Sequence, residues 1–404
     1  MPQTGVFERV TPELRTSFFY FTQLTTLGCG VVYAGIWFAQ KGIHSEQIAV
    51  INAVPVLIML VLNLVVGRIA DRASDWRQVI VIGSLVAGLV PVGLFFVNEF
   101  WGILAVWTLT ALPTSAIAPV ADAATMRMTR RNGSSFGGIR AWGTIGYIAA
   151  VGATSLIVAH FGPMSFVPLY VGLALLRAFA SLLLPQFRAP VREAVVSVKG
   201  VASRLREVMK PWFVLPLVGY AMVYGTHLIL NAFAALLWKR QGISEDVIGP
   251  LIMLGAVAEA SMMFGWRRFG SKVSPRNLLL LSAVVSAFRW TAMGFAPPVI
   301  VLVFLQLLHS ITFALGYLGC VHFIARWTSE DIAAEAQSFY VVLQQAMSVI
   351  ALVGFGWLVP VLGEHAYFVA AGFALLGAAL ILISLRMRQP ETHAASEKVR
   401  VAIS

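Results

Sequence analysis

Residues 67–77 read Gly-Arg-Ile-Ala-Asp-Arg-Ala-Ser-Asp-Trp-Arg, a basic turn set between two long apolar runs. Short loops on the cytoplasmic side of a membrane protein carry an excess of arginine and lysine. That tendency accounts for Arg72 and Arg77, but it does not account for Gly67 and Asp71 in register with them. The stretch therefore indicates a specific loop of a polytopic membrane protein.

The composition indicates the same class of protein. The chain of 404 residues is 59% hydrophobic and 12% charged, and its mean hydropathy of +0.82 lies outside the range of soluble globular domains. A membrane-spanning helix takes roughly 20 apolar residues, so the apolar residues suffice for about twelve spans. The two cysteines, Cys29 and Cys320, lie inside apolar runs. We therefore expect no disulfide framework, no metal cluster and no cofactor.

Twelve apolar stretches are predicted to be membrane-spanning helices, the first of them retained rather than cleaved as a signal peptide. They form two sets of six, separated by a polar stretch rich in arginine and lysine. The predicted spans are 17–40, 47–67, 78–97, 100–126, 137–159, 164–185, 211–238, 247–266, 277–296, 298–323, 336–360 and 366–386.

These spans predict an all-α membrane protein with two bundles of six helices. The N-terminal bundle is expected over residues 1–190 and a cytoplasmic linker over 191–210. The C-terminal bundle, with a short cytoplasmic tail, is expected over 211–404.

The two halves of the sequence repeat one another. Trp37 followed by Gly-Ile-His-Ser-Glu-Gln-Ile at 42–48 recurs as Trp238 followed by Gly-Ile-Ser-Glu-Asp-Val-Ile at 242–248. The stretch Gly-Arg-Ile-Ala-Asp-Arg from Gly67 has a weaker partner, Gly-Trp-Arg-Arg-Phe-Gly from residue 265. Parallel repeats of this kind are typical of secondary transporters.

The basic residues predict the orientation. If both termini are cytoplasmic, the cytoplasmic segments hold 23 of the 29 lysines and arginines, and the opposite side holds three, Lys41, Lys239 and Arg240. Such a bias places both termini and the linker in the cytoplasm. The net charge of +11 then reflects topology and attraction to anionic lipid head groups, and no nucleic-acid partner is expected.

The stretch at 67–77 resembles the signature loop between helices 2 and 3 of the major facilitator superfamily. Gly67, Asp71, Arg72 and Arg77 match its pattern Gly-x-x-x-Asp-Arg-x-x-x-x-Arg. The resemblance implies the major facilitator fold, with twelve helices, both termini in the cytoplasm and solute transport by alternating access. It also implies that these four residues form a conformational gate that braces the two halves in one state.

Charged groups inside the predicted spans are candidates for function, because a charge at bilayer depth is costly unless it has a partner. Arg177 and His322, near helix ends, are expected to be structural, with Arg177 snorkelling toward the interface. No phosphate-binding loop, zinc-protease motif or nucleophile elbow occurs, so an enzyme is not expected. The remaining charged or polar candidates are Asp122, Arg140, His227, Asn231, Glu259, Arg289, Gln306 and His309.

Two groups of these residues are expected to act together. Asp122 and Arg140 lie on consecutive predicted helices joined by a basic turn, so they can face one another. Glu259, Arg289 and His309 lie well inside three consecutive predicted spans of the second half.

In these positions the chain resembles the oligosaccharide–proton symporters related to lactose permease. The resemblance implies substrate binding by Asp122 and Arg140, and by Tyr147, where that family has a tryptophan that stacks on the sugar ring. It implies binding and proton coupling by Glu259, Arg289 and His309. His227, Asn231 and Gln306 are further expected binding residues. Thr312 stands where the family has a protonatable glutamate, which leaves Glu259 as the leading candidate for the proton carrier.

Shorter motifs resemble the phenylpropionate permease-like and nucleoside symporter-like branch of the same clan. They are Gly-Ile-Arg-Ala-Trp-Gly-Thr-Ile-Gly-Tyr at 138–147, Gly-Ala-Val-Ala-Glu at 255–259 and Gln-Leu-Leu-His-Ser-Ile-Thr-Phe at 306–313.

The sequence thus predicts a proton-coupled symporter, expected to be a monomer in a bacterial inner membrane. Its expected partners are protons, the lipid bilayer and a small solute, namely a sugar, a nucleoside or an aromatic carboxylate. One alternative is a drug or metabolite–proton antiporter, whose Pro-x-x-Gly-Pro signature is absent from 137–159. A more remote alternative is a non-transporting membrane receptor, although the tail after Gln389 is too short for a signalling domain.

Overall fold

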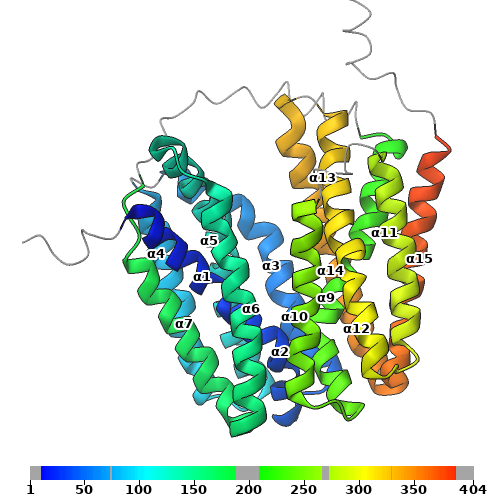
Figure 1. Cartoon of the computed structure of the whole chain (residues 1–404), viewed down its shortest axis with the longest axis horizontal. Coiled ribbons are helices and arrows are strands. Elements are labelled where there is room, and N and C mark those ends of the chain that lie inside the picture. Colours follow the sequence, from blue (N-terminus) through cyan, green and yellow to red (C-terminus); the bar gives the residue numbers. More distant parts are fainter. Residues whose placement is uncertain (1–10, 73–74, 188–208, 266–272, 329, 388–404) are drawn as a thin grey trace, which may run out of the picture. The chain divides into compact units, whose positions relative to one another are not determined.

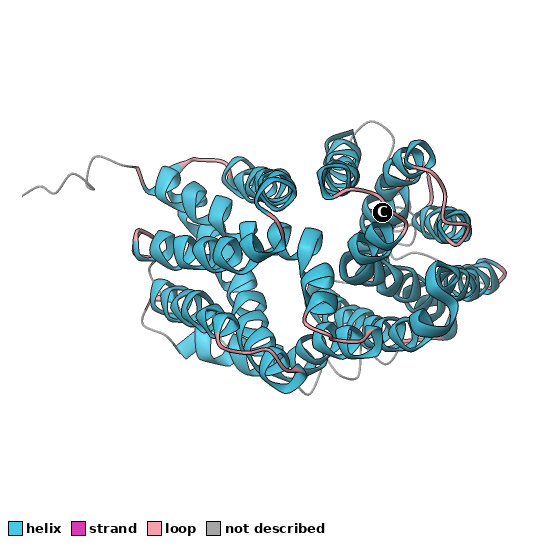
Figure 2. Ribbon diagram, turned by 90° about the horizontal axis from the view of Figure 1, so that it is seen from below, coloured by secondary structure: helices cyan, strands magenta, loops and turns pink. Residues whose placement is uncertain are grey.

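The computed structural model describes residues 11–72, 75–187, 209–265, 273–328 and 330–387. These residues form helices joined by short turns, and no strand occurs among them (Figures 1 and 2). Most of the predicted linker at 191–210 lies outside the described residues, as does most of the stretch at 265–270 that echoes the signature loop.

The helices of the first half are α1 (Pro12–Gln23), α2 (Thr25–Gln40), α3 (Ser45–Arg72), α4 (Trp76–Leu89), α5 (Phe100–Asn132), α6 (Phe136–Phe161) and α7 (Phe166–Leu182). Those of the second half are α9 (Pro211–Arg240), α10 (Glu245–Gly265), α11 (Pro275–Met293), α12 (Val299–Leu307), α13 (Gly316–Trp327), α14 (Glu330–Leu362) and α15 (Ala366–Leu385). Short turns are η2 (Val90–Phe95), η3 (Pro163–Ser165), η6 (Ser310–Leu315) and η7 (Gly363–His365).

Helices occupy all twelve ranges that the sequence predicts as spans, and the all-helical, membrane-type fold is confirmed. Within the described residues, eight segments are long and apolar enough to cross a membrane. One of them, 336–385, contains most of α14 and all of α15. The count of twelve crossings and the cytoplasmic location of both termini stay predictions.

The predicted span 78–97 ends in the turn η2, and two further predicted spans are divided in the structure. The predicted span 17–40 is divided at Leu24 into α1 and α2. The predicted span 298–323 consists of α12, the π-helical turn η6 and α13. Interruptions of this kind at membrane depth are tolerated only where protein covers the backbone, so both mark places of interest for function.

The chain separates into two compact units that do not follow one contiguous boundary. Unit 1 comprises Met1–Glu193, Leu228–Ala256 and Leu352–Gly363. Unit 2 comprises Ala194–His227, Val257–Ala351 and Glu364–Ser404.

The internal repeat is visible in the turns that end α2 and α9. Gly42 has φ 77° and Gly242 has φ 85°, a left-handed conformation that glycine adopts without steric cost. In both turns the residue after the glycine donates a backbone hydrogen bond of 3.0 Å, from Ile43 to Phe38 and from Ile243 to Trp238. The echo between 42–48 and 242–248 therefore reflects the same helix C-cap used twice.

Arg77, one of the four predicted gate residues, ties the start of α4 to the end of α7. Its Nε donates to the Leu184 carbonyl and its Nη2 to the Leu182 carbonyl, both at 2.8 Å. Asp75 caps α4 by accepting from the Arg77 amide at 2.8 Å. Arg77 therefore satisfies carbonyls that the end of a helix leaves open.

The second half repeats this joint. Ser274 caps α11 by accepting from the Asn277 amide at 3.3 Å. Arg276 then donates to the Ser384 carbonyl at 2.6 Å, near the end of α15. Of the other predicted gate residues, Gly67, Asp71 and Arg72 lie in the last turns of α3, where the side chains are outside the described part of the structure.

Glycines let α6 approach α1 and α2 closely. A Cβ on Gly146 would overlap the Phe21 carbonyl of α1, and a Cβ on Gly28 would lie 2.6 Å from the Tyr147 carbonyl of α6. Small residues at such contacts are typical of helix packing in membranes. This packing places the start of α6, with Arg140, beside α1.

Candidate functional site

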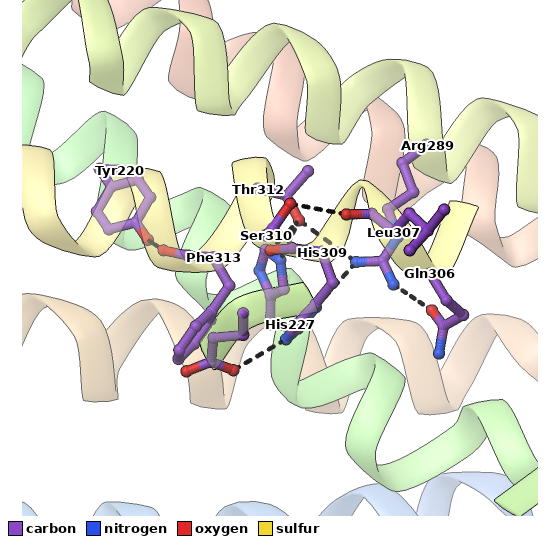
Figure 3. A network of polar contacts seen from close by, with 10 residues as sticks. Tyr220, His227, Arg289, Gln306, Leu307, His309, Ser310, Thr312 and Phe313 are labelled. Carbon is purple, nitrogen blue, oxygen red and sulfur yellow. Dashed lines mark hydrogen bonds and ion pairs between the residues drawn. The ribbon is translucent and has the colours of Figure 1, made fainter. Parts of the chain in front are cut away.

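A buried polar cluster in unit 2 brings together five of the predicted residues, from α9, α10, α11 and the α12–η6 segment. Figure 3 labels four of them, namely His227, Arg289, Gln306 and His309. Arg289 is fully buried, and His227 and Gln306 are each 2% exposed. Glu259 and His309 lie at the more open edge of the cluster, where their side chains are 27% and 14% exposed. The remaining member, Thr312, was noted in the sequence only as a departure from a family pattern.

Arg289 is the centre of the cluster. Its Nη1 lies 3.2 Å from His309 Nδ1 and 3.4 Å from Thr312 Oγ1, and its Nη2 donates to Gln306 Oε1. The guanidinium also lies 4.9 Å from the ring centre of Trp290. An arginine has no acceptor, so it is the donor in each hydrogen bond.

This arrangement determines which nitrogen of each histidine carries the proton. Because Arg289 can only donate, His309 Nδ1 must accept, and the ring proton sits on Nε2, 3.5 Å from Glu259 Oε2. His227 Nδ1 lies 2.9 Å from the Val223 carbonyl, so that nitrogen donates. When His227 is neutral, its Nε2 accepts from Thr312 Oγ1 at 2.9 Å.

The cluster is therefore a continuous chain of side chains, with Glu259 at one end and His227 at the other. The Thr312 hydroxyl is the junction, because it accepts from Arg289 and donates to His227. A glutamate here would bring a carboxylate into direct contact with Arg289. With threonine, Glu259 is the carboxylate that the described residues place in the chain, and it reaches Arg289 through His309.

The π-helical turn η6 shapes this chain. The Thr312 carbonyl accepts from Ser282 Oγ at 2.7 Å, and the Phe313 carbonyl accepts from Tyr220 Oη at 2.8 Å. The Phe313 ring stacks on His309 with centroids 5.3 Å apart and planes 6° from parallel. Turns of this type occur frequently at functional sites, and here the turn carries Thr312 and follows His309.

Gly316 holds the π-helical turn against α9 and α11, and its replacement by alanine is expected to destabilise the protein. A Cβ at this position would overlap the Tyr220 ring and lie 2.5 Å from Ser282 Oγ. Overpacking of this kind typically costs about 1–3 kcal/mol, so the midpoint of thermal unfolding in detergent should fall by several degrees. Gly354→Ala is the matched control, because a Cβ on Gly354 meets no atom within 4 Å. Equal midpoints for the two variants would contradict this account of the turn.

In unit 1 the structure brings Asp122 and Arg140 together and adds a third residue, Tyr20. Arg140 Nε lies 3.6 Å from Asp122 Oδ1. Tyr20 donates to the same oxygen at 2.6 Å, and its ring centre lies 5.5 Å from the guanidinium carbon of Arg140. Gly143 leaves room for Arg140, since a Cβ there would lie 3.0 Å from Nη1. Tyr20 belongs to α1, and the sequence contains no motif that pairs it with α5.

A second contact joins α1 and α5 at the polar ends of these helices. Asn132 Nδ2 donates to Glu13 Oε1 at 2.7 Å, and Ser134 Oγ donates to the same atom at 3.3 Å. The hydrogen bond from Asn132 is the main cause that lowers the pKa of Glu13 below its usual value.

Unit 1 also contains a cavity of about 210 Å³. Asn231, a predicted binding residue, lies in its wall. Tyr147 lies two turns beyond Arg140 on α6, with its carbonyl against Gly28. The other residues around the cavity are Thr26, Leu27, Gly30, Val31, Ala34, Gly35, Asn52, Trp107, Thr110, Ala111, Thr114, Ser115, Tyr170 and Ala232.

The prediction that Arg177 snorkels is wrong. Its side chain is fully buried among α2, α4 and α5. It donates to Thr114 Oγ1 at 3.0 Å, to Thr26 Oγ1 at 3.5 Å and to the Ala87 carbonyl at 2.8 Å. Three acceptors in the interior hold the guanidinium there. Two of them, Thr26 and Thr114, also line the cavity.

Comparison with known proteins identifies the family. The profile described as the MFS_1 like family matches residues 14–357. The chain is 27% identical over 373 residues to the probable 3-phenylpropionic acid transporter of Escherichia coli (strain K12), covering 88% of this chain and 93% of that protein. It is 25% identical over 333 residues to the maltose permease of Geobacillus stearothermophilus, covering 80% and 81% of the two chains.

Solved structures show the same fold. The nucleoside transporter NupG superposes with a TM-score of 0.80 at 16% identity, over 94% of this chain and all of that chain. An inward-facing bacterial homologue of the human lysosomal transporter Spinster gives a TM-score of 0.72 at 14% identity, over 94% and 98% of the two chains. The chain is thus a multi-pass membrane protein and a secondary transporter that belongs to the MFS_1 like family of the major facilitator superfamily.

Proposed function

We propose that this transporter is a proton-coupled symporter that imports a small organic solute across a bacterial inner membrane. The observation that carries the proposal is the chain Glu259–His309–Arg289 in unit 2. There a protonatable carboxylate, a histidine in a defined tautomer and a buried permanent cation lie in sequence, at 3.5 Å and 3.2 Å.

A proton on Glu259 would change the electrostatics of the whole cluster. When Glu259 is ionised, its negative charge offsets the buried charge of Arg289 through the intervening His309. When Glu259 is protonated, that compensation is lost and the guanidinium is free to attract another anion or dipole. Since a bound group shifts a conformational equilibrium only by its differential affinity for the two states, this link between proton and cation supports coupling.

We assign substrate binding to Asp122, Arg140, Tyr147, His227, Asn231 and Gln306, and coupling to Glu259, Arg289 and His309. Gly67, Asp71, Arg72 and Arg77 are proposed to gate alternating access. The names of the relatives, which refer to 3-phenylpropionic acid, maltose and nucleosides, support the solute classes to be tried.

The test is uptake by purified protein in proteoliposomes under an imposed pH gradient, acidic outside. Radiolabelled maltose, uridine and 3-phenylpropionate form the first panel. We expect one of them to accumulate above its equilibrium level, and a protonophore to abolish that accumulation. Accumulation only when the inside is acidic would show antiport. An uptake that is the same with and without the pH gradient would show a uniporter and overturn proton coupling.

A further inference from the structure

The cavity of unit 1 has the size and the walls of a site for one small ring. Its volume of about 210 Å³ is below the roughly 300–1,000 Å³ of sites for drug-sized ligands. It therefore suits a single-ring solute better than a disaccharide or a peptide.

Two aromatic residues in the wall of the cavity, Trp107 and Tyr170, lie against each other. Trp107 of α5 and Tyr170 of α7 stack with centroids 5.3 Å apart and planes 19° from parallel. Gly30 of α2 stands beside them: a Cβ added there would lie 3.7 Å from Trp107 Cη2 and 3.8 Å from Tyr170 Cε2, in ordinary contact. The absence of a side chain on Gly30 thus leaves space beside two rings, which favour another aromatic ring as a neighbour.

Arg177 lies directly behind this cavity and is not neutralised by a carboxylate. Among the described residues no acidic side chain forms an ion pair with it, and its Nε has no hydrogen-bond partner. A buried charge without a counter-charge is costly, and its field extends into the adjoining space. Arg289 differs, because its chain of contacts ends at Glu259.

Thr26 connects Arg177 with the cavity. Its hydroxyl accepts from Arg177 at 3.5 Å, and it donates no hydrogen bond to any described residue. The Thr114 hydroxyl, by contrast, donates to the Thr110 carbonyl at 2.7 Å. The hydroxyl proton of Thr26 is therefore available for a hydrogen bond to an acceptor in the cavity. A hydroxyl that accepts from a cation also becomes a stronger donor.

The internal repeat shows that the fold does not need a charge at this position. The turn η3 and helix α7 begin 200 residues before η7 and α15, so Arg177 corresponds to Gly377. Gly377 packs directly on α9, with a Cβ there only 2.5 Å from the Gly219 carbonyl. The second half thus closes the equivalent place by backbone contact, whereas the first half keeps a cation and a cavity.

We propose that this cavity binds a small planar organic anion, with the ring beside Trp107 and Tyr170 and the carboxylate toward Thr26 and the charge of Arg177. This proposal rests on the proposed transport function, and it specifies the class of solute that is transported. Arg177 acts through Thr26, so it is a positioning residue rather than a direct ligand.

The test is equilibrium binding of benzoate and 3-phenylpropionate, and of the corresponding amides, to the purified full-length protein in nanodiscs. We expect each carboxylate to bind at least about ten times more tightly than its amide, because the amide lacks the charge that Arg177 attracts. In the Thr26→Val variant, each carboxylate should bind no more than about three times more tightly than its amide. Thr25→Val is the matched control, because the Thr25 hydroxyl donates to the Thr22 carbonyl in the last turn of α1 and Thr25 does not line the cavity.

A size series tests the location independently of charge. Gly30→Ala is expected to keep binding, whereas Gly30→Leu should fill the space beside Trp107 and weaken carboxylate and amide alike by at least about tenfold. Arg177→Met should abolish the preference for the carboxylate. If that variant does not fold, the Thr26 and Gly30 variants decide the question.

Wild-type binding by both Thr26→Val and Gly30→Leu would overturn the site, as would equal binding of acid and amide by the wild-type protein. These outcomes differ from failure of the proposed function. Proton-driven uptake of maltose or uridine without binding of either carboxylate would refute the site and leave the symporter intact. Carboxylate binding with the expected pattern, without gradient-driven uptake, would refute the symporter and leave the site.

Discussion

Glu259→Gln is expected to abolish proton-driven accumulation of solute while exchange of solute across the membrane stays measurable. Glutamine keeps the size of the side chain and a group that can accept from His309 Nε2, but it cannot take up or release a proton. With Glu259 as the carboxylate that reaches Arg289 through His309, the variant removes the titration and preserves the contacts. In proteoliposomes the ratio of internal to external solute should fall to about one, whereas counterflow should persist.

Glu245→Gln is the matched control for this experiment. Glu245 lies on the same helix, α10, and pairs with Lys239 Nζ at 2.6 Å at the start of the helix, away from the polar cluster of unit 2. The loss of such a pair costs at most about 1 kcal/mol, so accumulation should continue. If Glu259→Gln accumulates solute at the level of the unmodified protein, the proton carrier is another residue, with Asp122 or His309 next to be tested.

Arg140→Lys is expected to weaken solute binding by about ten- to a hundredfold. Asp122 engages only Nε of Arg140, and among the described residues the two Nη groups donate no hydrogen bond. They form a planar fork, which a lysine cannot reproduce. A charge-assisted hydrogen bond contributes about 1.5–3 kcal/mol, and about 1.4 kcal/mol corresponds to a tenfold change in affinity. Titration calorimetry of the folded protein would measure the change with the solute that the uptake panel identifies.

Arg130→Lys serves as the control, because Arg130 lies exposed in the last turn of α5 and contacts neither Asp122 nor Tyr20. Unchanged affinity in Arg140→Lys would make Asp122, Arg140 and Tyr20 a structural brace between α1, α5 and α6. Solute binding would then have to be sought among His227, Asn231 and Gln306, or in the cavity beside Thr26.

The sequence alone predicted the family and the helical ranges, because both depend on local order along the chain. Apolar runs of sufficient length specify helices in a membrane whatever their neighbours are. The spacing of Gly67, Asp71, Arg72 and Arg77 indicated the superfamily. The echo of 42–48 in 242–248 is now explained by two left-handed glycines that end α2 and α9 in the same way.

The sequence also predicted two polar groupings that the structure contains. Asp122 meets Arg140, and Glu259, His309 and Arg289 form a chain. These residues could be found because a charge inside a long apolar run is conspicuous and requires a partner. Their roles in binding and coupling remain proposals.

Other parts of the sites could be found only from the tertiary structure, because their chemistry lies in contacts rather than in residue type. Thr312 resembles any helical threonine until the π-helical turn places its hydroxyl between Arg289 and His227. Tyr20 has no feature that marks it as the partner of Asp122.

Arg177 shows the difference most directly. A hydropathy profile averages over the residues of one predicted span, and it places this arginine near the end of that span. From there its side chain could reach the membrane surface. Whether the side chain turns outward or inward depends on the rotation of α7 and on acceptors supplied by other helices. The sequence by itself determined the helices and the family, because those follow from local composition and spacing. Packing decided which groups Arg177, Thr26 and Thr312 contact, because a hydrogen bond requires two groups from distant parts of the chain to meet at about 3 Å.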